Sequence, residues 1–592
     1  MSHFLIGIKS SQVAISMNDE QPGQMLSLSS EKGKLNIESQ EYNGSVFSTE
    51  KECWGILGVY SFVHRLYLAF VEEAKLVGNG AKGGAIYKIM KVNVIPIPCK
   101  DAIYVDEDND CDKQLVEMIY TIYKIDNYYF SYTENITKKL QDQGPKIREF
   151  SHKYPDDVDT YFMFNSNVIE SFKPLSSVLY DDLLLTVING FIAIEPGCVI
   201  DGHSFRLIII SRRTIHNIGR RFNSRGIDEN GDVANFVETE QILVTSSQEV
   251  YSYVQIRGSI PLKWTQTPTL KYDPKVNIIE DNNNVLFKTH MDMLKDRYTS
   301  VLCVNLIDKK KTQQRLGDAY ERAILKSQNA NIAFEWFDFH HECAKMKYQN
   351  LSKLVLKTID FFMNNSYYGY TSEGRVINTQ TGVIRTNCVD SLDRTNVVQS
   401  LYARRIIFLQ LGLHDQLEDI IINSPFADFE TIYKNIWADN ANVLSREYSG
   451  TNAQKTDFTR TGKRTTRGAI DDLECSITRY YLNNFVDGYI IDCYKVTCGH
   501  YIPSLDVNCQ QIMKTQSYST FNKFAFGILV PIALISSIIT YFSHSDCPIT
   551  TTLGQFIIYF GTVAYVLIKK GTSFGRKFVN KSKFTINHTK KE

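Results

Sequence analysis

A cysteine and an arginine separated by five residues, Cys388 and Arg394, constrain the fold of this chain most strongly. Just before them, Val383 and Ile384 predict a short strand, and from Thr395 onward apolar residues recur at helical spacing. The pair therefore lies in a tight loop between a strand and the N-terminus of a helix. Such a loop binds anions, because unpaired N–H groups point into it and the helix dipole adds positive potential.

The residue types at these two positions predict phosphoryl-transfer chemistry. A helix N-terminus stabilises the ionised form of a cysteine thiol, which is the form that attacks phosphorus. Arginine can hold two phosphate oxygens at once and offset the charge that develops during transfer. The loop has the layout of a cysteine-dependent phosphatase, with Cys388 as nucleophile and Arg394 as the phosphate-binding, transition-state-stabilising residue. Because thiolate and arginine supply both functions, we expect no metal ion or other cofactor.

The spacing alone is a weak signal, and the residues around it carry more information. Free cysteines are usually small buried core residues, and a chain with 12 cysteines can show Cys-x5-Arg by chance. The surrounding stretch, RTNCVDSLDRTN, closely resembles the signature of the Sac-domain phosphoinositide phosphatases, whose usual form carries CxDCLDRTN. It departs from that form at Ser391, where the family commonly has a second cysteine that could form a protective disulfide with the nucleophile.

The resemblance covers roughly residues 50–570, including two apolar segments near the C-terminus. Within the family, the chain is most similar to the membrane-anchored type of the endoplasmic reticulum and Golgi. The resemblance implies hydrolysis of phosphatidylinositol monophosphates through a phosphocysteine intermediate. The 4-phosphate is the chief expected substrate, and the 3-phosphate is the second candidate. The densest matches are four stretches: Arg225–Gln241, Phe337–Cys343, Arg385–Asn396 and Trp437–Arg464.

Two acidic residues inside the loop are candidates for the proton donor to the leaving inositol oxygen. Asp393 is the first candidate, because it lies in the loop itself, and Asp390 is the second. An acid from another segment could also reach this position. Thr395 is expected to hydrogen-bond the thiolate or aid its departure, and Asn387 and Ser391 are expected to contact the substrate.

A polar and strongly basic stretch, Trp437–Gly468, follows the catalytic helix. Its composition alone fits a loop with charges in water equally well, but it closely resembles a basic block of the same family. A basic loop near the catalytic loop would suit a polyanionic inositol headgroup or an anionic membrane surface. Four of its residues are therefore expected to bind substrate: Lys455, Arg460, Lys463 and Arg464.

Charge and cysteine usage limit the partners and the compartment. The chain has 65 basic and 65 acidic residues, so it gives no global case for nucleic-acid binding. Its 12 cysteines include no CxxC pair, which favours a reducing compartment over a disulfide framework. The first residues lack the long apolar core of a signal peptide. We therefore expect the bulk of the protein to face the cytosol, and its protein partners stay unknown.

Length and local patterning predict an α/β catalytic domain with a Cys-x5-Arg phosphatase loop, preceded by a β-rich domain and followed by a two-helix transmembrane hairpin. With 592 residues the chain is long enough for two or three domains. The expected order is a β-rich N-terminal domain at 1–180, the catalytic domain at 181–505, a linker at 506–523, the hairpin at 524–568 and a basic cytosolic tail at 569–592.

Two apolar segments near the C-terminus predict the membrane hairpin. Phe524–Phe542 and Cys547–Ile568 contain 19 and 22 residues without a charge, and about 20 residues suffice to span a bilayer as a helix. Lysine and arginine lie outside the pair and not in its connector, so both ends should be cytosolic. The final residues, HTKKE, only partly resemble a dilysine retrieval signal. An endoplasmic reticulum address, with the Golgi as second candidate, therefore follows mainly from the resemblance.

Three further stretches give ambiguous signals. Five arginines between Arg212 and Arg225 would be a solvated face by ordinary surface statistics, although they lead into a family-like stretch. The acidic stretch Asp106–Asp112 is expected to be a solvated loop. The ligand-type residues in Phe337–Cys343 are adjacent, so they cannot all face one metal ion.

Two alternative functions stay open from the sequence. A protein phosphatase could use the same loop, and a catalytically silent phosphoinositide-binding tether could keep the loop for binding alone. The presence of Cys388, Asp393 and Arg394 together argues against the tether.

Overall fold

The computed structural model describes residues 4–9, 12–17, 24–31, 33–41, 50–99, 110–145, 157–175, 183–414, 423–503 and 579–584. The predicted linker and both predicted membrane-spanning segments lie outside these residues. Among the helices of the described part, none combines the length and the apolar character that crossing a bilayer requires.

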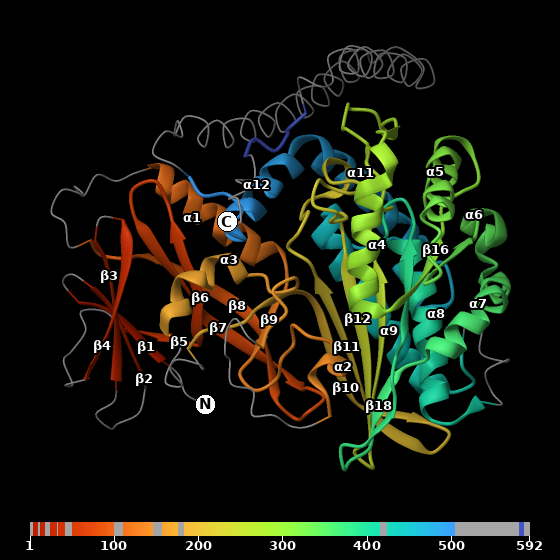
Figure 1. Ribbon diagram of the computed structural model, residues 1–592, viewed down its shortest axis with the longest axis horizontal. Coiled ribbons are helices and arrows are strands. Elements are labelled where there is room, and N and C mark those ends of the chain that lie inside the picture. Colours follow the sequence, from red (N-terminus) through yellow and green to blue (C-terminus); the bar gives the residue numbers. More distant parts are fainter. Residues whose placement is uncertain are drawn as a thin grey trace, which may run out of the picture.

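The first strands of the chain form a small sheet of their own, at the left of Figure 1. Its neighbouring strands are antiparallel, in the order β4-β3-β2-β1-β5. Alternate apolar residues such as Val13 and Ile15 are buried in a core shared with β6 and β7. The strands are β1 (Phe4–Lys9), β2 (Gln12–Met17), β3 (Gln24–Glu31), β4 (Lys34–Glu41) and β5 (Glu50–Cys53).

A second, much larger sheet of 13 described strands crosses the predicted boundary at residue 180. The crossing point is the pairing of β9 with β10, through Tyr129 opposite Ile188 and Tyr128 opposite Asn189. Its main path is β17 (Ile332–Trp336), β16 (Ser300–Asn305), β20 (Gly382–Asn387), β13 (Val250–Arg257), β12 (Val237–Thr245), β11 (His203–Arg213), β10 (Ile188–Ile200), β9 (Tyr128–Ser131), β8 (Ala85–Pro96), β7 (Leu66–Asn79) and β6 (Gly55–Ser61). Beside this path lie β18 (Tyr368–Tyr370) and β19 (Val376–Asn378), and β14 (Trp264–Thr265) pairs separately with β15 (Asn277–Ile278).

The sheet is mixed, and its parallel part carries the predicted phosphatase loop. The strands β17, β16, β20 and β13 are parallel, whereas β13 back to β6 are antiparallel. Parallel neighbours need crossover connections, which the chain supplies as helices. The carboxyl ends of β13, β16 and β20 therefore lie at one edge of the sheet, where ligands of such folds commonly bind.

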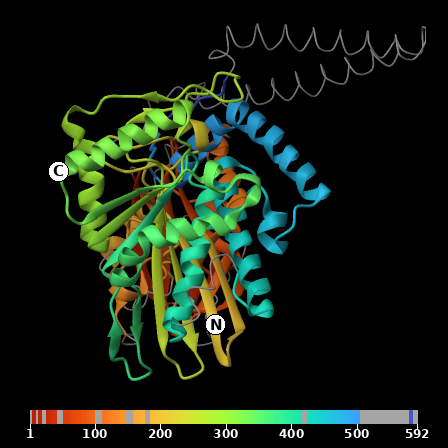
Figure 2. The ribbon, with the colours of Figure 1, turned by 90° about the vertical axis from the view of Figure 1, so that its right-hand side faces the viewer.

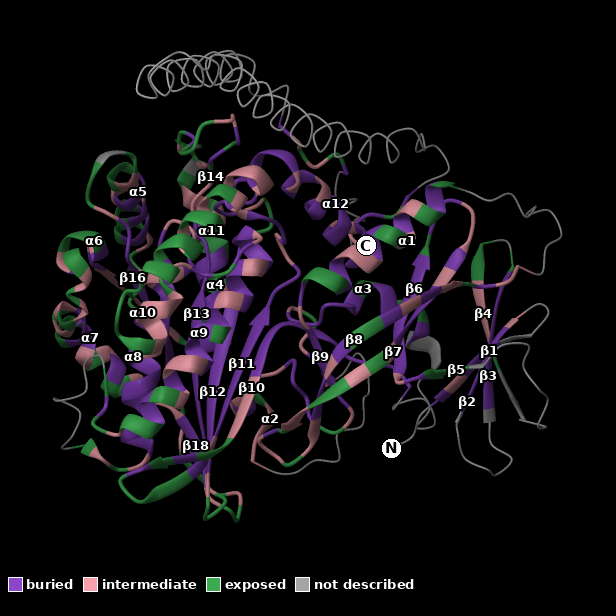
Figure 3. Cartoon of the chain, turned by 180° about the vertical axis from the view of Figure 1, so that it is seen from behind, coloured by how far each residue is buried: buried purple, intermediate pink, exposed green. Residues whose placement is uncertain are grey.

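Helices cover both faces of this sheet, as Figure 2 shows from the side. On β16, Val301 and Cys303 pack towards α4 and α5, whereas Leu302 and Val304 pack towards α7, α8 and α9. Strands between two helical layers are buried on both faces, and β12 and β13 are accordingly buried almost throughout (Figure 3). The α/β expectation is confirmed in this mixed form.

The helices are distributed along the whole described chain. The α-helices are α1 (Asp110–Ile125), α2 (Leu140–Gln143), α3 (Ser166–Ile169), α4 (Val285–Tyr298), α5 (Lys311–Ser327), α6 (Phe339–Glu342), α7 (Ser352–Asn365), α8 (Asp393–Gln410), α9 (Ala427–Ser449), α10 (Thr456–Thr461), α11 (Thr466–Phe485) and α12 (Asp487–Thr497). The short 3-10 helices are η1 (Glu170–Leu175), η3 (Arg221–Asn223), η4 (Asn282–Asn284), η5 (Ala344–Met346) and η6 (Tyr348–Leu351).

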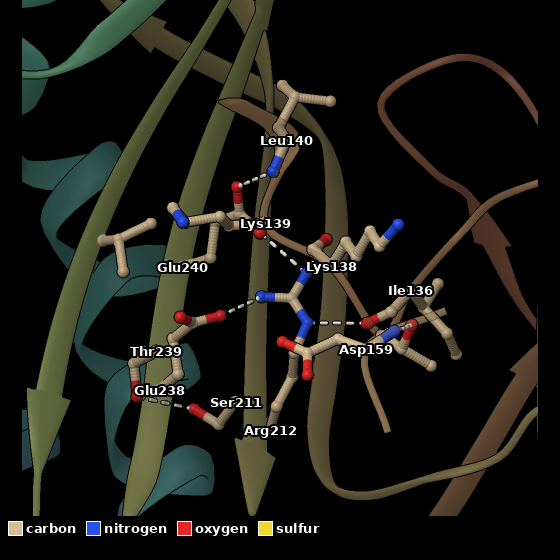
Figure 4. Close-up of polar contacts among 12 residues, drawn as sticks. Ile136, Lys138, Lys139, Leu140, Asp159, Ser211, Arg212, Glu238, Thr239 and Glu240 are labelled. Carbon is tan, nitrogen blue, oxygen red and sulfur yellow. Dashed lines mark hydrogen bonds and ion pairs between the residues drawn. The ribbon is translucent and has the colours of Figure 1, made fainter. Parts of the chain in front are cut away.

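The arginine cluster is not a solvated face. Arg212 is 1% exposed and lies between two carboxylates, with its Nη1 3.0 Å from Glu238 Oε1 and its Nη2 2.7 Å from Glu240 Oε2 (Figure 4). Its Nε donates to the carbonyl oxygen of Ile136 at 2.6 Å, and its Nη2 also donates to that of Lys138. The network joins β11 and β12 to the segment before α2, so the composition-based expectation is wrong because both acids lie on the neighbouring strand.

The acidic stretch is also only partly a loop. Residues 106–109 lie outside the described residues, but Asp110 begins α1 and Asp112 lies in its first turn. Asp112 is buried and accepts hydrogen bonds from the backbone N–H groups of Val63 and His64, at 3.2 and 3.3 Å. The expectation of a solvated loop is therefore wrong for Asp112, because its carboxylate caps a connection between two strands.

The last described segment, 579–584, binds to α12. The buried carboxylate of Asp492 accepts hydrogen bonds from the hydroxyl of Ser582 and from the backbone N–H groups of Lys583 and Phe584. The ring of Phe584 stacks on that of Tyr501, with ring centres 4.0 Å apart. Residues on both sides of 504–578 are thus in contact with each other.

Candidate active site

The predicted loop lies between β20 and α8. β20 ends at Asn387 and α8 begins at Asp393, two residues before the predicted start at Thr395. Ser391 adopts a left-handed backbone conformation with φ of 52°, and its hydroxyl donates to the carbonyl oxygen of Gly258 at 2.8 Å. This bond fixes the middle of the loop to the residue that follows β13. Cys388 is 4% exposed at the start of the loop.

A cavity of about 220 Å³ lies over the loop and brings most of the predicted catalytic residues together. Cys388, Asp390, Asp393 and Arg394 all line it. Lys455, which directly precedes α10, is the member of the predicted basic group that also lines it. The remaining wall includes side chains that the sequence did not single out as site residues, among them Arg221, Phe339, His340, Tyr348 and Arg479.

Arg394 is held by a residue from the neighbouring strand end. Its Nη1 donates to the carbonyl oxygen of Leu306 at 2.9 Å and to Asp308 Oδ1 at 3.0 Å. The imidazole Nδ1 of His340 lies 2.9 Å from the same Asp308 oxygen. Burial raises the pKa of Asp308, but the hydrogen bond from His340 and the charge of Arg394 outweigh it and lower the pKa overall. Asp308 is therefore an ionised positioning group for Arg394.

Asp390 forms ion pairs with two arginines. Its carboxylate lies 2.9 Å from Arg221 Nη2 and 2.5 Å from Arg225 Nη2. Burial raises the pKa of Asp390, but these two charges outweigh that effect and hold the pKa far below its ordinary value. A carboxylate that stays ionised is a poor proton donor. Arg220 points elsewhere and donates to the carbonyl oxygen of Arg446 at 2.6 Å.

Asp393 has the opposite environment. Desolvation in the cavity wall raises the pKa of Asp393, and the charge of Arg479 and the N–H of Gln454 only partly oppose this. The Gln454 N–H donates to its Oδ1 at 3.0 Å, whereas Arg479 Nη1 stands 4.0 Å from its Oδ2. The two loop acids therefore differ in the direction of their pKa shifts, and Asp393 is the one that can retain a proton.

Three predicted loop residues do not line the cavity. Thr395 and Asn387 are fully buried, and Asn387 Nδ2 donates to Asn305 Oδ1 at 2.7 Å. The hydroxyl of Thr395 has no hydrogen-bond partner among the described residues. Ser391 uses its hydroxyl to fix the loop, as described above. The structure therefore places Asn387 and Ser391 as supports of the loop.

The other predicted basic residues, Arg460, Lys463 and Arg464, do not line the cavity. Arg460 pairs with Asp439 at 2.5 Å, and Arg464 pairs with Asp457 at 2.6 Å and also with Asp472. Lys463 is exposed. The acids that pair with Arg460 and Arg464 offset much of the positive charge that the sequence indicates for this block.

A further arginine lies beneath the loop. Arg257 ends β13, is 1% exposed, and donates from Nη2 to side-chain oxygens of Asn396 and Gln399 on α8. Burial lowers the pKa of Arg257 to about 9, and the nearby Cys388 and Asp393 act in the opposite direction. Arg257 belongs to the stretch VQIRGSIPLKWTQ and Asp308 ends the stretch VNLID. Both stretches resemble the Sac-domain pattern, and this resemblance is the signal by which the sequence could have indicated these two residues.

Comparisons with known proteins show the family to which this chain is similar. A family profile described as the SacI homology domain matches residues 54–344. The phosphatidylinositol-3-phosphatase SAC1-A of Danio rerio is 37% identical over 457 residues, which cover 76% of each chain. The phosphatidylinositol-3-phosphatase SAC1 of Drosophila melanogaster is 32% identical over 560 residues, 91% of this chain and 90% of the relative. The protein of the same name from Saccharomyces cerevisiae is 34% identical over 436 residues, 71% and 68% of the two chains.

Proposed function

Because this chain belongs to the Sac-domain family of phosphoinositide phosphatases, we propose that it dephosphorylates phosphatidylinositol monophosphates to phosphatidylinositol, chiefly the 4-phosphate and also the 3-phosphate. The observation that carries the proposal is that Cys388, Asp393 and Arg394 line one cavity. The names of the three relatives specify the 3-phosphate. The rates of phosphate release from the two isomers therefore have to be compared directly.

The proposed reaction has two displacements at phosphorus. In the first, the Cys388 thiolate attacks phosphorus, the bond to the inositol oxygen breaks, and Asp393 gives that oxygen its proton. Arg394, held by Asp308, and the N–H groups of the loop bind the phosphate oxygens. In the second, water attacks the phosphocysteine, Asp393 takes a proton from the water, and the thiolate leaves as phosphate is released.

Phosphate release by the purified full-length chain tests the proposal. The substrates are dioctanoyl phosphatidylinositol 4-phosphate, its 3-phosphate isomer and a phosphotyrosine peptide. We expect release from both lipids, faster from the 4-phosphate. Faster release from the peptide would indicate a protein phosphatase, and lipid binding without any release would indicate a tether.

Removal of the proposed acid gives a pH-dependent result. Asp393→Asn is expected to lower kcat on the lipid by about 10²–10⁴-fold, because the leaving oxygen then departs without a proton. Since Asp393 must be protonated and its pKa is raised, the wild-type rate should fall only as the pH rises through that raised pKa. The variant should lose this alkaline decline. A pH–rate profile of kcat measures both effects.

The matched variant for the acid is Asp390→Asn. It removes the ion pairs to Arg221 and Arg225 but not the proposed proton donor. It should therefore retain the alkaline decline. If the decline disappears in Asp390→Asn and persists in Asp393→Asn, the acid is misassigned.

Asp308 is expected to act through Arg394. Asp308→Asn should lower kcat by up to about 100-fold, because a misplaced guanidinium no longer matches the phosphate oxygens. Titration of phosphate binding and steady-state kinetics on the same lipid measure the effect. His341→Asn is the control, since His341 contacts Glu342 and not Asp308. Equal rates for Asp308→Asn and wild type would remove Asp308 from this role.

We also propose that segments 524–542 and 547–568 anchor the enzyme in the endoplasmic reticulum membrane, with the Golgi as a second location and both ends in the cytosol. The length and lack of charge of these segments support the proposal. Extraction of cell membranes at high pH tests it, because an anchored protein stays in the membrane pellet. Release into the supernatant would contradict the anchor.

A further inference from the structure

A second cavity, of about 230 Å³, adjoins the catalytic cavity. The two cavities share Tyr348, Val397 and Thr459 in their walls. The ring of Tyr348 packs edge-on against that of Phe458, with ring centres 5.2 Å apart, so two aromatic side chains stand where the cavities meet. Half of the remaining wall of the second cavity consists of large apolar or aromatic residues, namely Met346, Leu351, Leu401, Tyr433, Trp437 and Phe458, and the other half is mostly polar or charged.

The helix that carries the catalytic arginine also forms a wall of the second cavity. Arg394 lies in the first turn of α8, and Val397, Ser400 and Leu401 follow on the next two turns. The opposite walls come from η5, η6, α9 and α10, and Figure 3 shows α10 beside α8 and α9. A ligand group bound here is therefore placed by the same rigid helix that presents the phosphate-binding residue.

The chemistry of this cavity differs from that of the catalytic cavity. Two cations line it, and both pair with Glu430: Arg404 at 2.8 Å and Lys434 at 3.5 Å. Because their charges are already shared with this carboxylate, neither is a free site for another phosphate. Trp437 is 1% exposed, and its ring centre lies 6.1 Å from that of Tyr433. A wall that combines such aromatic rings with polar side chains, among them Gln349 and Ser400, fits an ester group with a short stretch of hydrocarbon.

We propose that this cavity, defined by Met346, Leu351, Leu401, Tyr433, Trp437 and Phe458, receives the glycerol ester and the first acyl carbons of the substrate lipid. The proposal rests on the proposed function and adds the part of the substrate that the enzyme recognises beyond the inositol phosphate. Each cavity is smaller than the about 300–1,000 Å³ of typical ligand sites, so each suits one part of a larger molecule. The enzyme therefore selects acylated over deacylated phosphoinositides.

Filling the cavity tests the proposal. Ser400→Trp on α8 places a bulky side chain in it, and Leu356→Trp is the matched control, because Leu356 on α7 is 72% exposed and lines neither cavity. The full-length protein is assayed on dioctanoyl phosphatidylinositol 4-phosphate and on the deacylated glycerophosphoinositol 4-phosphate. We expect kcat/KM for the lipid to fall by about tenfold or more in Ser400→Trp, since lost contacts with single methylene groups already change specificity by such factors. The value for the deacylated compound should stay at the wild-type level, and Leu356→Trp should match wild type on both compounds.

A second filling variant covers the case in which Ser400→Trp does not fold. Gln349→Trp adds the same side chain from the exposed rim of the cavity and should give the same selective loss. An unchanged ratio of the two kcat/KM values in a folded tryptophan variant would overturn the proposal, as would equal wild-type values for the two compounds. If the wild-type protein releases phosphate from the deacylated compound alone, the proposed role of this cavity is overturned, but the protein is still a phosphatase. No release from either compound would overturn the proposed function as well.

Discussion

Serine in place of Cys388 is expected to lower phosphate release from dioctanoyl phosphatidylinositol 4-phosphate by at least about 10⁴-fold, which is the scale seen when an enzyme loses its nucleophile. A serine hydroxyl does not ionise near neutral pH, and within the described residues no second cysteine lines the cavity. The side chain is nearly the same size, so the loop should keep its shape. Release of inorganic phosphate over time measures the change.

Two controls distinguish loss of the nucleophile from loss of the loop. The variant should still bind the lipid, and its thermal unfolding midpoint should match that of wild type. Acid-quenched wild type should carry phosphate on the peptide that contains Cys388, and the variant should carry none. A residual rate within tenfold of wild type would remove Cys388 from the proposed role.

The largest expected effect on stability comes from Arg212. Arg212→Met should destabilise the protein by about 3–5 kcal/mol, because it leaves the buried carboxylates of Glu238 and Glu240 without their cation. Burial already raises the pKa of Glu238, and without the opposing charge of Arg212 that pKa rises further above its unfolded value. The penalty then grows as the pH rises above the unfolded glutamate pKa of about 4.3 and is small below it. Urea midpoints measured from pH 4 to 7.5 check this trend.

The matched variant for this prediction is Arg467→Met. Arg467 is 85% exposed and pairs with Asp471 one helical turn away at 3.0 Å, so its loss should not change the urea midpoint. A second variant, Arg212→Met combined with glutamine at Glu238 and Glu240, should recover part of the midpoint because no charge is then buried alone. If Arg212→Met alone behaves like Arg467→Met, the buried network does not stabilise the packing of β11 and β12 against the segment before α2.

The catalytic loop was predictable because its signals are local. The β-branched residues before Cys388 and the helical periodicity after it lie within one short stretch, and the structure has a strand and a helix there. The helix start differs by two residues, since the first turn of α8 contains Asp393 and Arg394, which carry no apolar periodicity. The α/β class followed from the same local alternation of strands and helices.

The supports of the site were not predictable in the same way, because they come from distant segments. Asp308 reaches Arg394 because β16 and β20 are parallel neighbours. Asp308 and His340 are 32 positions apart, and the pairing of β16 with β17 brings them together. Arg221 and the buried Arg225 both donate to the carboxylate of Asp390, which is more than 160 positions away. Composition treats such residues as solvated, and only the sheet order brings the opposite charges together.

The contact of residues 579–584 with α12 has a consequence for cleavage of the chain. Phe584 stacks on Tyr501, and the carboxylate of Asp492 accepts hydrogen bonds from Ser582, Lys583 and Phe584. The parts of the chain before and after 504–578 are therefore bound to each other. A protease that cuts once within 504–578 would break the covalent chain without separating its ends. The short C-terminal fragment would stay with the large one under native conditions and leave it only when α12 unfolds.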